Sequence, residues 1–466
     1  MIRTVLATAL LACSTTALAE VPTWESDVAR TRSPHDESLS ARSMTVDNDG
    51  DIHVDVRFLQ APADLDRSFA HVAHAIIGAN TGYFRDDALF PSRFLNEDSC
   101  GLQIRGAKVL NCINDAPTSS TQNPWPLAQG MLVLQEKASF QAPGQPPFIE
   151  ERWNARLPEG HKILAAGFGD NDHLAAITTD TRGPATAWPT RFVVSVTPGG
   201  GVHPSISPLR VCEAGYGDTI VKEETRVADH GLAVDVALCK RRDDAFRQPF
   251  IQFNAIDAVM HTPPVAHDIT LPPDASDVLL DIANDGTAYV FYRKQQQAWF
   301  VSWHARTGTS PAQPLGVEGA VESVSILADT LGIVLKDDVG NRTLAWLDRT
   351  QPWPDPARRA FLPADRYPDA GHVVFNAQGD AFFLSRLFPS QNAPHALNVV
   401  RRSTQPFQMP QARTVDLLHD SQWTNADSPP LLAPIGDHGV AVALTVHPNG
   451  DPQSSLVRVS RYDLQD

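Results

Sequence analysis

The densest group of side chains that could carry out chemistry is Tyr83, Arg85, Asp86 and Asp87, which follow the turn sequence Gly-Ala-Asn-Thr-Gly at residues 78–82. A phenol, a guanidinium and two carboxylates are groups that enzymes use to transfer protons and to stabilise developing charge. These four residues are therefore the first candidates for a catalytic site.

Two histidines in the same region have a spacing that could serve a metal ion. The sequence DRSFAHVAHAIIGAN, residues 66–80, predicts a short helix that ends near Gly78, with His71 and His74 three residues apart on one face. No third ligand follows at a recognisable spacing, although Asp86, Asp87, Glu97 and Asp98 lie further along the chain. The sequence therefore predicts no metal site, and two partly solvated helical histidines are favoured over a metal pair.

Acidic turns elsewhere imitate known ligand motifs without completing them. In VDNDGD, residues 46–51, Gly50 comes fourth in the candidate loop, whereas a calcium-binding EF-hand requires glycine at the sixth position. The sequences ADHG at 228–231 and GDHG at 436–439 place a histidine beside an aspartate, as an acid–base pair would. An acid-rich hairpin turn is favoured over a calcium loop for VDNDGD. A solvated turn is favoured over catalysis for ADHG and GDHG, because both occupy the turn position of a repeat.

No cofactor is predicted, because the chain contains no Gly-x-Ser-x-Gly elbow, phosphate loop, dinucleotide fingerprint or His-Glu-x-x-His helix. Among the nine tryptophans, Trp299 and Trp303 are four residues apart and would share one face of a strand. Packing between sheets is the favoured role for such residues, and stacking on sugar rings in a central funnel is the alternative.

The elements that would position these groups form a repeat of strand, turn, strand, loop and strand. Turns rich in Asp, Asn and Gly separate two apolar runs at eight places, as β-hairpins require. The eight units are SMTVDNDGDIHVDVRF, WPLAQGMLVLQE, ILAAGFGDNDHLAAITT, TRVADHGLAVDVAL, LLDIANDGTAYVFY, VSILADTLGIVLK, HVVFNAQGDAFFLS and LLAPIGDHGVAVALTV. Most intervals between them are close to those of a four-stranded propeller blade.

The second strand of each unit identifies the architecture. Runs such as AYVFY, AFFL and VAVAL are apolar at consecutive positions, which indicates strands covered on both faces. Few helical patterns exist to cover them, so neighbouring sheets must do so. Over nearly the whole chain the pattern resembles β-propeller repeat proteins, without the signature of any subfamily. The resemblance implies an all-β single propeller of seven or eight blades, and consecutive β-sandwiches are the alternative.

Two further features of the propeller are expected. The first interval, about 80 residues from Asp51 to Met131, is longer than its neighbours, which predicts an inserted loop and helix excursion at residues 61–100 in the first blade. Closure of the ring is expected from the last strand, residues 454–462, pairing with strands from the N-terminal segment near SARSMTV.

The N-terminal residues predict export. Residues 1–19 read as a signal peptide, with Arg3 before an apolar run that ends in Ala-Leu-Ala, leaving residues 20–466 as the propeller domain. The sequence Leu10-Leu11-Ala12-Cys13 resembles a lipobox, which would make Cys13 a lipid anchor of an outer-membrane lipoprotein. Cleavage after Ala19, giving a periplasmic or secreted protein, is favoured. No later segment is apolar for long enough to cross a membrane.

Four cysteines follow the signal segment, and an oxidising compartment would pair them. Cys100 and Cys112 lie at equal distances from Gly106, so a hairpin turning there would bring them together. By elimination, Cys212 pairs with Cys239.

The formal net charge of −16 opposes binding to nucleic acid or to an anionic membrane. Two functions remain. The first is an exported binding scaffold of the bacterial envelope or the exterior, for a protein or glycan ligand. The second is a carbohydrate-active hydrolase or lyase with its site in the central funnel, where converging carboxylates and an arginine would support catalysis.

Overall fold

The fold comes from a computed structural model. It describes residues 22–30, 37–60, 69–80, 82, 97–115, 128–138, 149–181, 191–204, 209, 211–212, 219–240, 249–260, 262–327, 330–349, 359–362, 364, 373–386, 395–402, 412–416, 430–437, 439–446 and 455–463. The predicted signal peptide, Cys13 and the residues Tyr83, Arg85, Asp86 and Asp87 lie outside this part of the chain.

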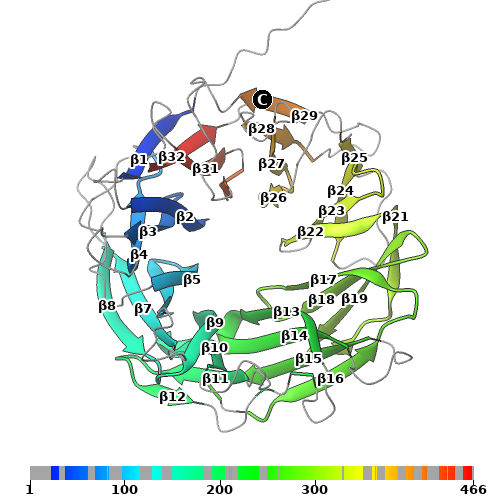
Figure 1. Ribbon diagram of the computed structural model, residues 1–466, viewed down its shortest axis with the longest axis horizontal. Coiled ribbons are helices and arrows are strands. Elements are labelled where there is room, and N and C mark those ends of the chain that lie inside the picture. The colour runs from blue at the N-terminus through cyan, green and yellow to red at the C-terminus, as the bar shows by residue number, and fades with distance from the viewer. Residues whose placement is uncertain are drawn as a thin grey trace, which may run out of the picture.

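Eight antiparallel sheets follow one another around a ring, so the protein is a single eight-bladed β-propeller (Figure 1). The first four blades comprise β2 (Glu37–Val46), β3 (Ile52–Gln60) and β4 (Phe69–Ile77); β5 (Glu97–Arg105), β6 (Lys108–Asp115), β7 (Gln129–Lys137) and β8 (Ile149–Arg156); β9 (His161–Phe168), β10 (Leu174–Asp180), β11 (Arg191–Val196) and β12 (Val202–Pro204); and β13 (Thr219–Val227), β14 (Leu232–Lys240), β15 (Phe250–Asp257) and β16 (Val265–Thr270).

The last four blades comprise β17 (Ser276–Ile282), β18 (Ala288–Lys294), β19 (Gln297–His304), β20 (Gly308–Thr309) and β21 (Gln313–Glu318); β22 (Ala320–Ile326), β23 (Thr330–Lys336), β24 (Arg342–Asp348) and β25 (Arg359–Leu362); β26 (Val373–Phe375), β27 (Ala381–Arg386), β28 (His395–Val400) and β29 (Ala412–Asp416); and β30 (Leu431–Ile435), β31 (Gly439–Val446), β32 (Leu456–Asp463) and β1 (Trp24–Arg30). Two 3-10 turns, Asp170–Asp172 and Asp229–Gly231, are the only helical segments among the described residues. None of the helices that the structure describes could span a membrane.

The first strand of each blade lies nearest the centre of the ring (Figure 1). Tight turns connect it to the second strand, and the side chain at the start of the turn organises several of them. In the first blade, one carboxylate oxygen of Asp47 accepts the backbone N–H groups of Asp49 and Asp51, and Gly50 adopts a φ of 83°. In the seventh blade, the amide oxygen of Asn376 accepts the N–H of Asp380 in the same way. These contacts are the reason that Asp, Asn and Gly mark the repeat.

The second strands are buried on both faces, as their sequences predict. In β18 the first five residues are buried, and in β27 the side chains of Phe382 and Phe383 are fully buried. The apolar clusters lie between neighbouring blades. Between the fourth and fifth blades, Trp303 stacks on Phe253 with ring centroids 5.2 Å apart. Packing between blades is therefore confirmed for Trp303.

The ring is closed by pairing of the two ends of the described chain. β32 pairs with β1, in a register that places Glu25 opposite Ser460. Closure by the last strand and the N-terminal segment is confirmed. The strand that pairs is β1, whereas SARSMTV itself lies in β2 and pairs with β3 in the first blade. The alternating sequence pattern fits both β1 and β2 as the partner of β32. Only the geometry of the ring selects β1, which becomes the outer strand of the last blade.

The prediction of a helix at residues 66–80 is wrong. Residues Phe69–Ile77 form β4 and pair with β3 along its whole length, so residues 71 and 74 do not share one face as they would in a helix. The apolar residues Val72, Ile76 and Ile77 fit both periodicities, and cross-strand pairing decides between them. The inserted excursion at 61–100 is not confirmed, since β4 belongs to the first blade and β5 to the second.

Candidate functional site

A cavity of about 320 Å³ lies against the first strands of the second to fifth blades, β5, β9, β13 and β17. A second cavity of about 210 Å³ continues along the same strands towards the turns that end them. Both cavities are lined by Gln103 and Arg226. We refer to the two cavities together as the channel site, because the strands that line them are those nearest the centre of the ring (Figure 1).

Three charged side chains gather in the larger cavity of the channel site. Glu224 and Arg226 are two residues apart on β13, so the strand period of two places them on one face, and Asp281 comes from the neighbouring β17. The Arg226 guanidinium donates a hydrogen bond from Nη1 to the carbonyl oxygen of Ile282, which ties the two blades together. Two carboxyl groups and a guanidinium therefore face one space.

The surroundings of these carboxyl groups favour their protonated forms. Burial and the negative charge of Asp281 raise the pKa of Glu224, and Arg226 opposes the shift. Burial also raises the pKa of Asp281, although the backbone N–H of Ile282 donates to its Oδ1 at 2.7 Å and Arg226 lies close by. The side chain of Glu224 remains exposed to the channel, and it forms no hydrogen bond with any residue that the structure describes.

This arrangement can do two things chemically. Two carboxyl groups and a guanidinium offer donors and acceptors for the hydroxyl groups of a ligand. A pair of carboxyl groups with raised pKa values can also transfer protons, as in glycoside hydrolysis.

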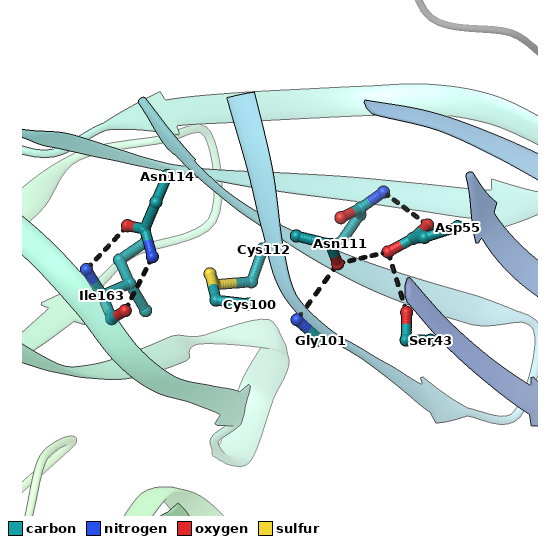
Figure 2. Close-up of a disulfide and its surroundings, with 9 residues drawn as sticks. Ser43, Asp55, Cys100, Gly101, Asn111, Cys112, Asn114 and Ile163 are labelled. Carbon is teal, nitrogen blue, oxygen red and sulfur yellow. Dashed lines mark hydrogen bonds between the residues drawn. A yellow bond between two sulfur atoms is a disulfide. The ribbon is translucent and has the colours of Figure 1, made fainter. Parts of the chain in front are cut away.

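The disulfide between Cys100 and Cys112 forms part of the wall of the larger cavity, beside Gly101. It joins β5 to β6 across the hairpin that turns at Gly106, as the sequence predicts. The disulfide between Cys212 and Cys239 is also confirmed. Figure 2 shows the first disulfide next to Asn111 and Asp55, where the second blade meets the first. The bridge therefore braces the wall of the channel site.

A second polar constellation is buried within the first blade. His53 Nε2 lies 3.3 Å from an oxygen of Asp47, and His53 Nδ1 lies 3.2 Å from Nε2 of His74. His74 Nδ1 lies 3.0 Å from Oδ1 of Asp55. The four side chains thus form a continuous chain of polar contacts, which we call the histidine chain. Both histidines are fully buried.

Both ends of the histidine chain are anchored by the second blade. Lys137 on β7 donates to Asp47 at 3.0 Å. At the other end, Ser43 and Ser99 donate to one oxygen of Asp55 at 3.0 and 2.5 Å, and Asn111 donates to the other at 3.2 Å. Figure 2 shows the contacts of Ser43 and Asn111 with Asp55.

The charges of the histidine chain are set by its surroundings. Burial would raise the pKa of Asp47, but the hydrogen bonds and charges of His53 and Lys137 outweigh it and lower that pKa to about 2. Burial lowers the pKa of His53, so its ring is neutral at pH 7 and Lys137 supplies the positive charge beside Asp47. Burial opposes the positive charge of Lys137, but three neighbouring aspartates raise its pKa. Through Lys137, Ser99 and Asn111, the histidine chain joins the first two blades.

The structure describes some of the candidate residues predicted from the sequence and not others. His74 belongs to the histidine chain, while Tyr83, Arg85, Asp86 and Asp87 lie outside the described residues, as does the side chain of His71. The turn at 228–231 is solvated, with His230 Nδ1 2.7 Å from Asp170 of the preceding blade. Within the described ranges, no three His, Cys, Asp or Glu side chains are placed to hold a metal ion.

Sequence reasoning missed Glu224, Arg226 and Asp281, although a signal exists. Each lies in the first strand of a repeat, in the segments KEETRV and LLDI, a few residues before a predicted turn. Because first strands line the centre of a propeller, charged residues at alternating positions in them are candidates for a channel site.

Comparison with known proteins finds similarity only to solved structures. No protein-family model matches the chain, and no curated protein does. The β-propeller domain of the Trilobed protease from Pyrococcus furiosus is 7% identical, with a TM-score of 0.43, over 82% of this chain and 99% of that domain. Sqt1 from Chaetomium thermophilum is 11% identical, with a TM-score of 0.45, over 92% and 98% of the two chains.

Prolyl oligopeptidase B from Galerina marginata is a further similar structure, 9% identical with a TM-score of 0.43, over 88% of this chain and 55% of that one. At such low identities the likeness concerns the fold alone.

Proposed function

We propose that the protein is an exported binding scaffold of the bacterial envelope or the exterior, and that its ligand is a glycan held in the channel site. The observation that carries this proposal is the gathering of Glu224, Arg226 and Asp281 around one cavity. Among the described residues, none forms a hydrogen bond with the carboxyl group of Glu224. Such groups match the hydroxyls of a sugar. The two disulfides support export to an oxidising compartment, either the periplasm or the medium.

Binding is tested by a glycan-array screen of the purified protein, followed by calorimetric titration of the glycans that it retains. Glu224→Gln replaces a carboxyl group that can hydrogen-bond a sugar hydroxyl, so we expect affinity to fall by about tenfold or more. Glu150→Gln, on the outer strand β8 of the second blade, is the matched control and should leave affinity unchanged. Equal affinities of the wild type and Glu224→Gln would refute the channel site.

A carbohydrate-active hydrolase or lyase is the second candidate, and the raised pKa values of Glu224 and Asp281 favour it. The test is release of reducing ends from the glycans that bind, measured for the wild type, Glu224→Gln and Asp281→Asn. Loss of activity in both variants would support catalysis by the pair. Binding without turnover in the wild type would leave the scaffold as the function.

A further inference from the structure

A larger cavity, of about 630 Å³, lies at the turn-bearing side of the fourth and fifth blades. Its lining comes from the turns at Asp229 and Asp285, from the end of β15 at Asp257, and from the β19–β20 turn that includes Arg306. We call this the rim cavity. The turn at 228–231 and Trp303 border it, and the proposed function gives it no role.

The rim cavity continues the channel site along the same two chain segments. On the fourth blade, the larger channel cavity is lined by residues 224–226, the smaller by 226–229, and the rim cavity by 229 and 230. On the fifth blade the corresponding residues are 281, 284 and then 285 and 287. The order along both segments is the same. The three cavities therefore follow one another from the centre of the ring to its face.

Asp229 stands at the junction between the smaller channel cavity and the rim cavity. Its backbone N–H donates to the carbonyl oxygen of Asn284 at 2.7 Å, which fixes its place between the two blades. Among the described residues, no partner of its carboxylate is found. By contrast, Asp285 pairs with Arg349 at 2.6 Å, and Asp257 accepts the N–H groups of Val259 and Met260. Among the described residues, Asp229 is therefore a carboxylate of the rim that is available to a ligand.

The remaining lining selects the chemistry of that ligand. Ser302, Thr309 and Ser310 line the rim cavity, and the hydroxyl of Ser302 donates to that of Ser310 at 3.0 Å. The large aromatic residue of the lining, Trp303, is only 3% exposed. Peptides are recognised mainly through apolar and aromatic anchors, and this surface offers few. Sugars are recognised through many hydroxyl contacts. Five acidic side chains line the path, against three arginines, so the balance of side chains disfavours polyanionic glycans.

We propose that the channel site and the rim cavity together bind one linear oligosaccharide of neutral or amino sugars, which runs from the centre of the ring past Asp229 to the face. This inference rests on the proposed function, since it extends the same site. The channel cavities alone are of the size that holds a small ligand. Affinity should therefore rise with the length of the oligosaccharide until the rim cavity is filled.

The test is calorimetric titration with three length series, from dimer to octamer, of glucose, N-acetylglucosamine and glucosamine oligomers with β-1,4 linkage. For at least one series, we expect the octamer to bind at least tenfold more tightly than the dimer. Thr309→Trp fills the rim cavity from an exposed position, so it should abolish this gain and leave dimer binding unchanged. Thr270→Trp, at an exposed end of the outer strand β16, is the matched control.

The outcomes separate this inference from the proposed function. Equal binding of dimer and octamer, with binding still weakened by Glu224→Gln, would overturn the extended path and leave the channel site. Binding of a peptide library or of oligogalacturonate in place of all three series would also overturn the inference. Failure of every glycan to bind would overturn both.

Discussion

Asp47 is the residue on which the junction of the first two blades depends. Its side chain is 4% exposed, and it contacts Lys137, His53 and two backbone N–H groups of its own turn. A lowered pKa means that folding favours the ionised form. The stability that Asp47 contributes is therefore complete above its unfolded pKa of 3.8 and is lost as the pH falls towards about 2.

Asp47→Asn should lower the free energy of unfolding at pH 7 by about 2 kcal/mol, the amount that corresponds to the shift of its pKa. Chemical denaturation at pH 7, 4 and 2 measures this, and the difference from the wild type should shrink at the lowest pH. Asp49→Asn is the matched control, because Asp49 binds the same lysine but is 75% exposed. Similar stabilities of the two variants at pH 7 would contradict the role given to Asp47.

His53 makes a separate prediction with its own pH range. Because its pKa is lowered by burial, the unfolded chain takes up a proton at this position near pH 6.5 while the folded protein does not. Stability should therefore decrease as the pH falls below 6.5. In an NMR titration, the ring signal identified by its absence from His53→Gln should not shift at pH 6.5. A midpoint at or above 6.5 would show that the histidine chain is charged.

At the scale of the elements, turn chemistry predicted most of the architecture because the same side-chain contacts recur. Seven of the eight predicted hairpins join the first and second strands of blades. The exception is the turn at Ala128-Gln129-Gly130, where Gly130 lies in β7. A Cβ atom at Gly130 would lie 2.4 Å from Cγ1 of Ile163, so this glycine serves close packing between blades rather than a turn. The hairpin between the first and second strands of the second blade turns at Gly106. The second strand of that blade therefore begins earlier than Met131, and the first interval is no longer unusually long.

The channel site was less predictable, because its residues come from different blades. Glu224 and Asp281 are far apart in sequence, and only the arrangement of first strands around the centre brings them to one cavity. The histidine chain was difficult to predict for the same reason. His53 and His74 become neighbours only through the pairing of β3 with β4, and the sequence also fitted a helix there.

A substitution at Gly332 tests the packing of the sixth blade against the seventh. A Cβ atom at this position of β23 would lie 2.6 Å from the buried ring of Phe375 on β26. We expect Gly332→Ala to lower the free energy of unfolding by about 1 to 3 kcal/mol through overpacking. In the double variant Gly332→Ala/Phe375→Leu the clash is relieved, so the two effects should not add. Strict additivity in denaturant titrations would contradict this contact.

At the scale of the whole molecule, we expect closure of the ring to make the eight blades one cooperative unit. β1 supplies the outer strand of the last blade, so the blade that ends the chain is completed by the segment that begins it. Without β1, the edge of β32 would be exposed and the junction of the first and eighth blades would lose Val28, Ala29 and Trp24.

Deletion of residues up to Arg30 should therefore lower the midpoint of thermal unfolding markedly and broaden the transition. Asp27→Asn is the control, because the ion pair of Asp27 with Arg458 is partly exposed and its weakening should cost less than about 1 kcal/mol. Scanning calorimetry distinguishes the two. A truncated protein that unfolds like the wild type would contradict closure through β1.

The most direct measurement of the central claim is a crystal structure of the protein with the glycan that binds it most tightly. We predict density for sugar rings beside Glu224 and Arg226, continuing past Asp229 into the rim cavity. Sugar density confined to the outer strands, with an empty channel in a protein that binds the glycan in solution, would contradict the account.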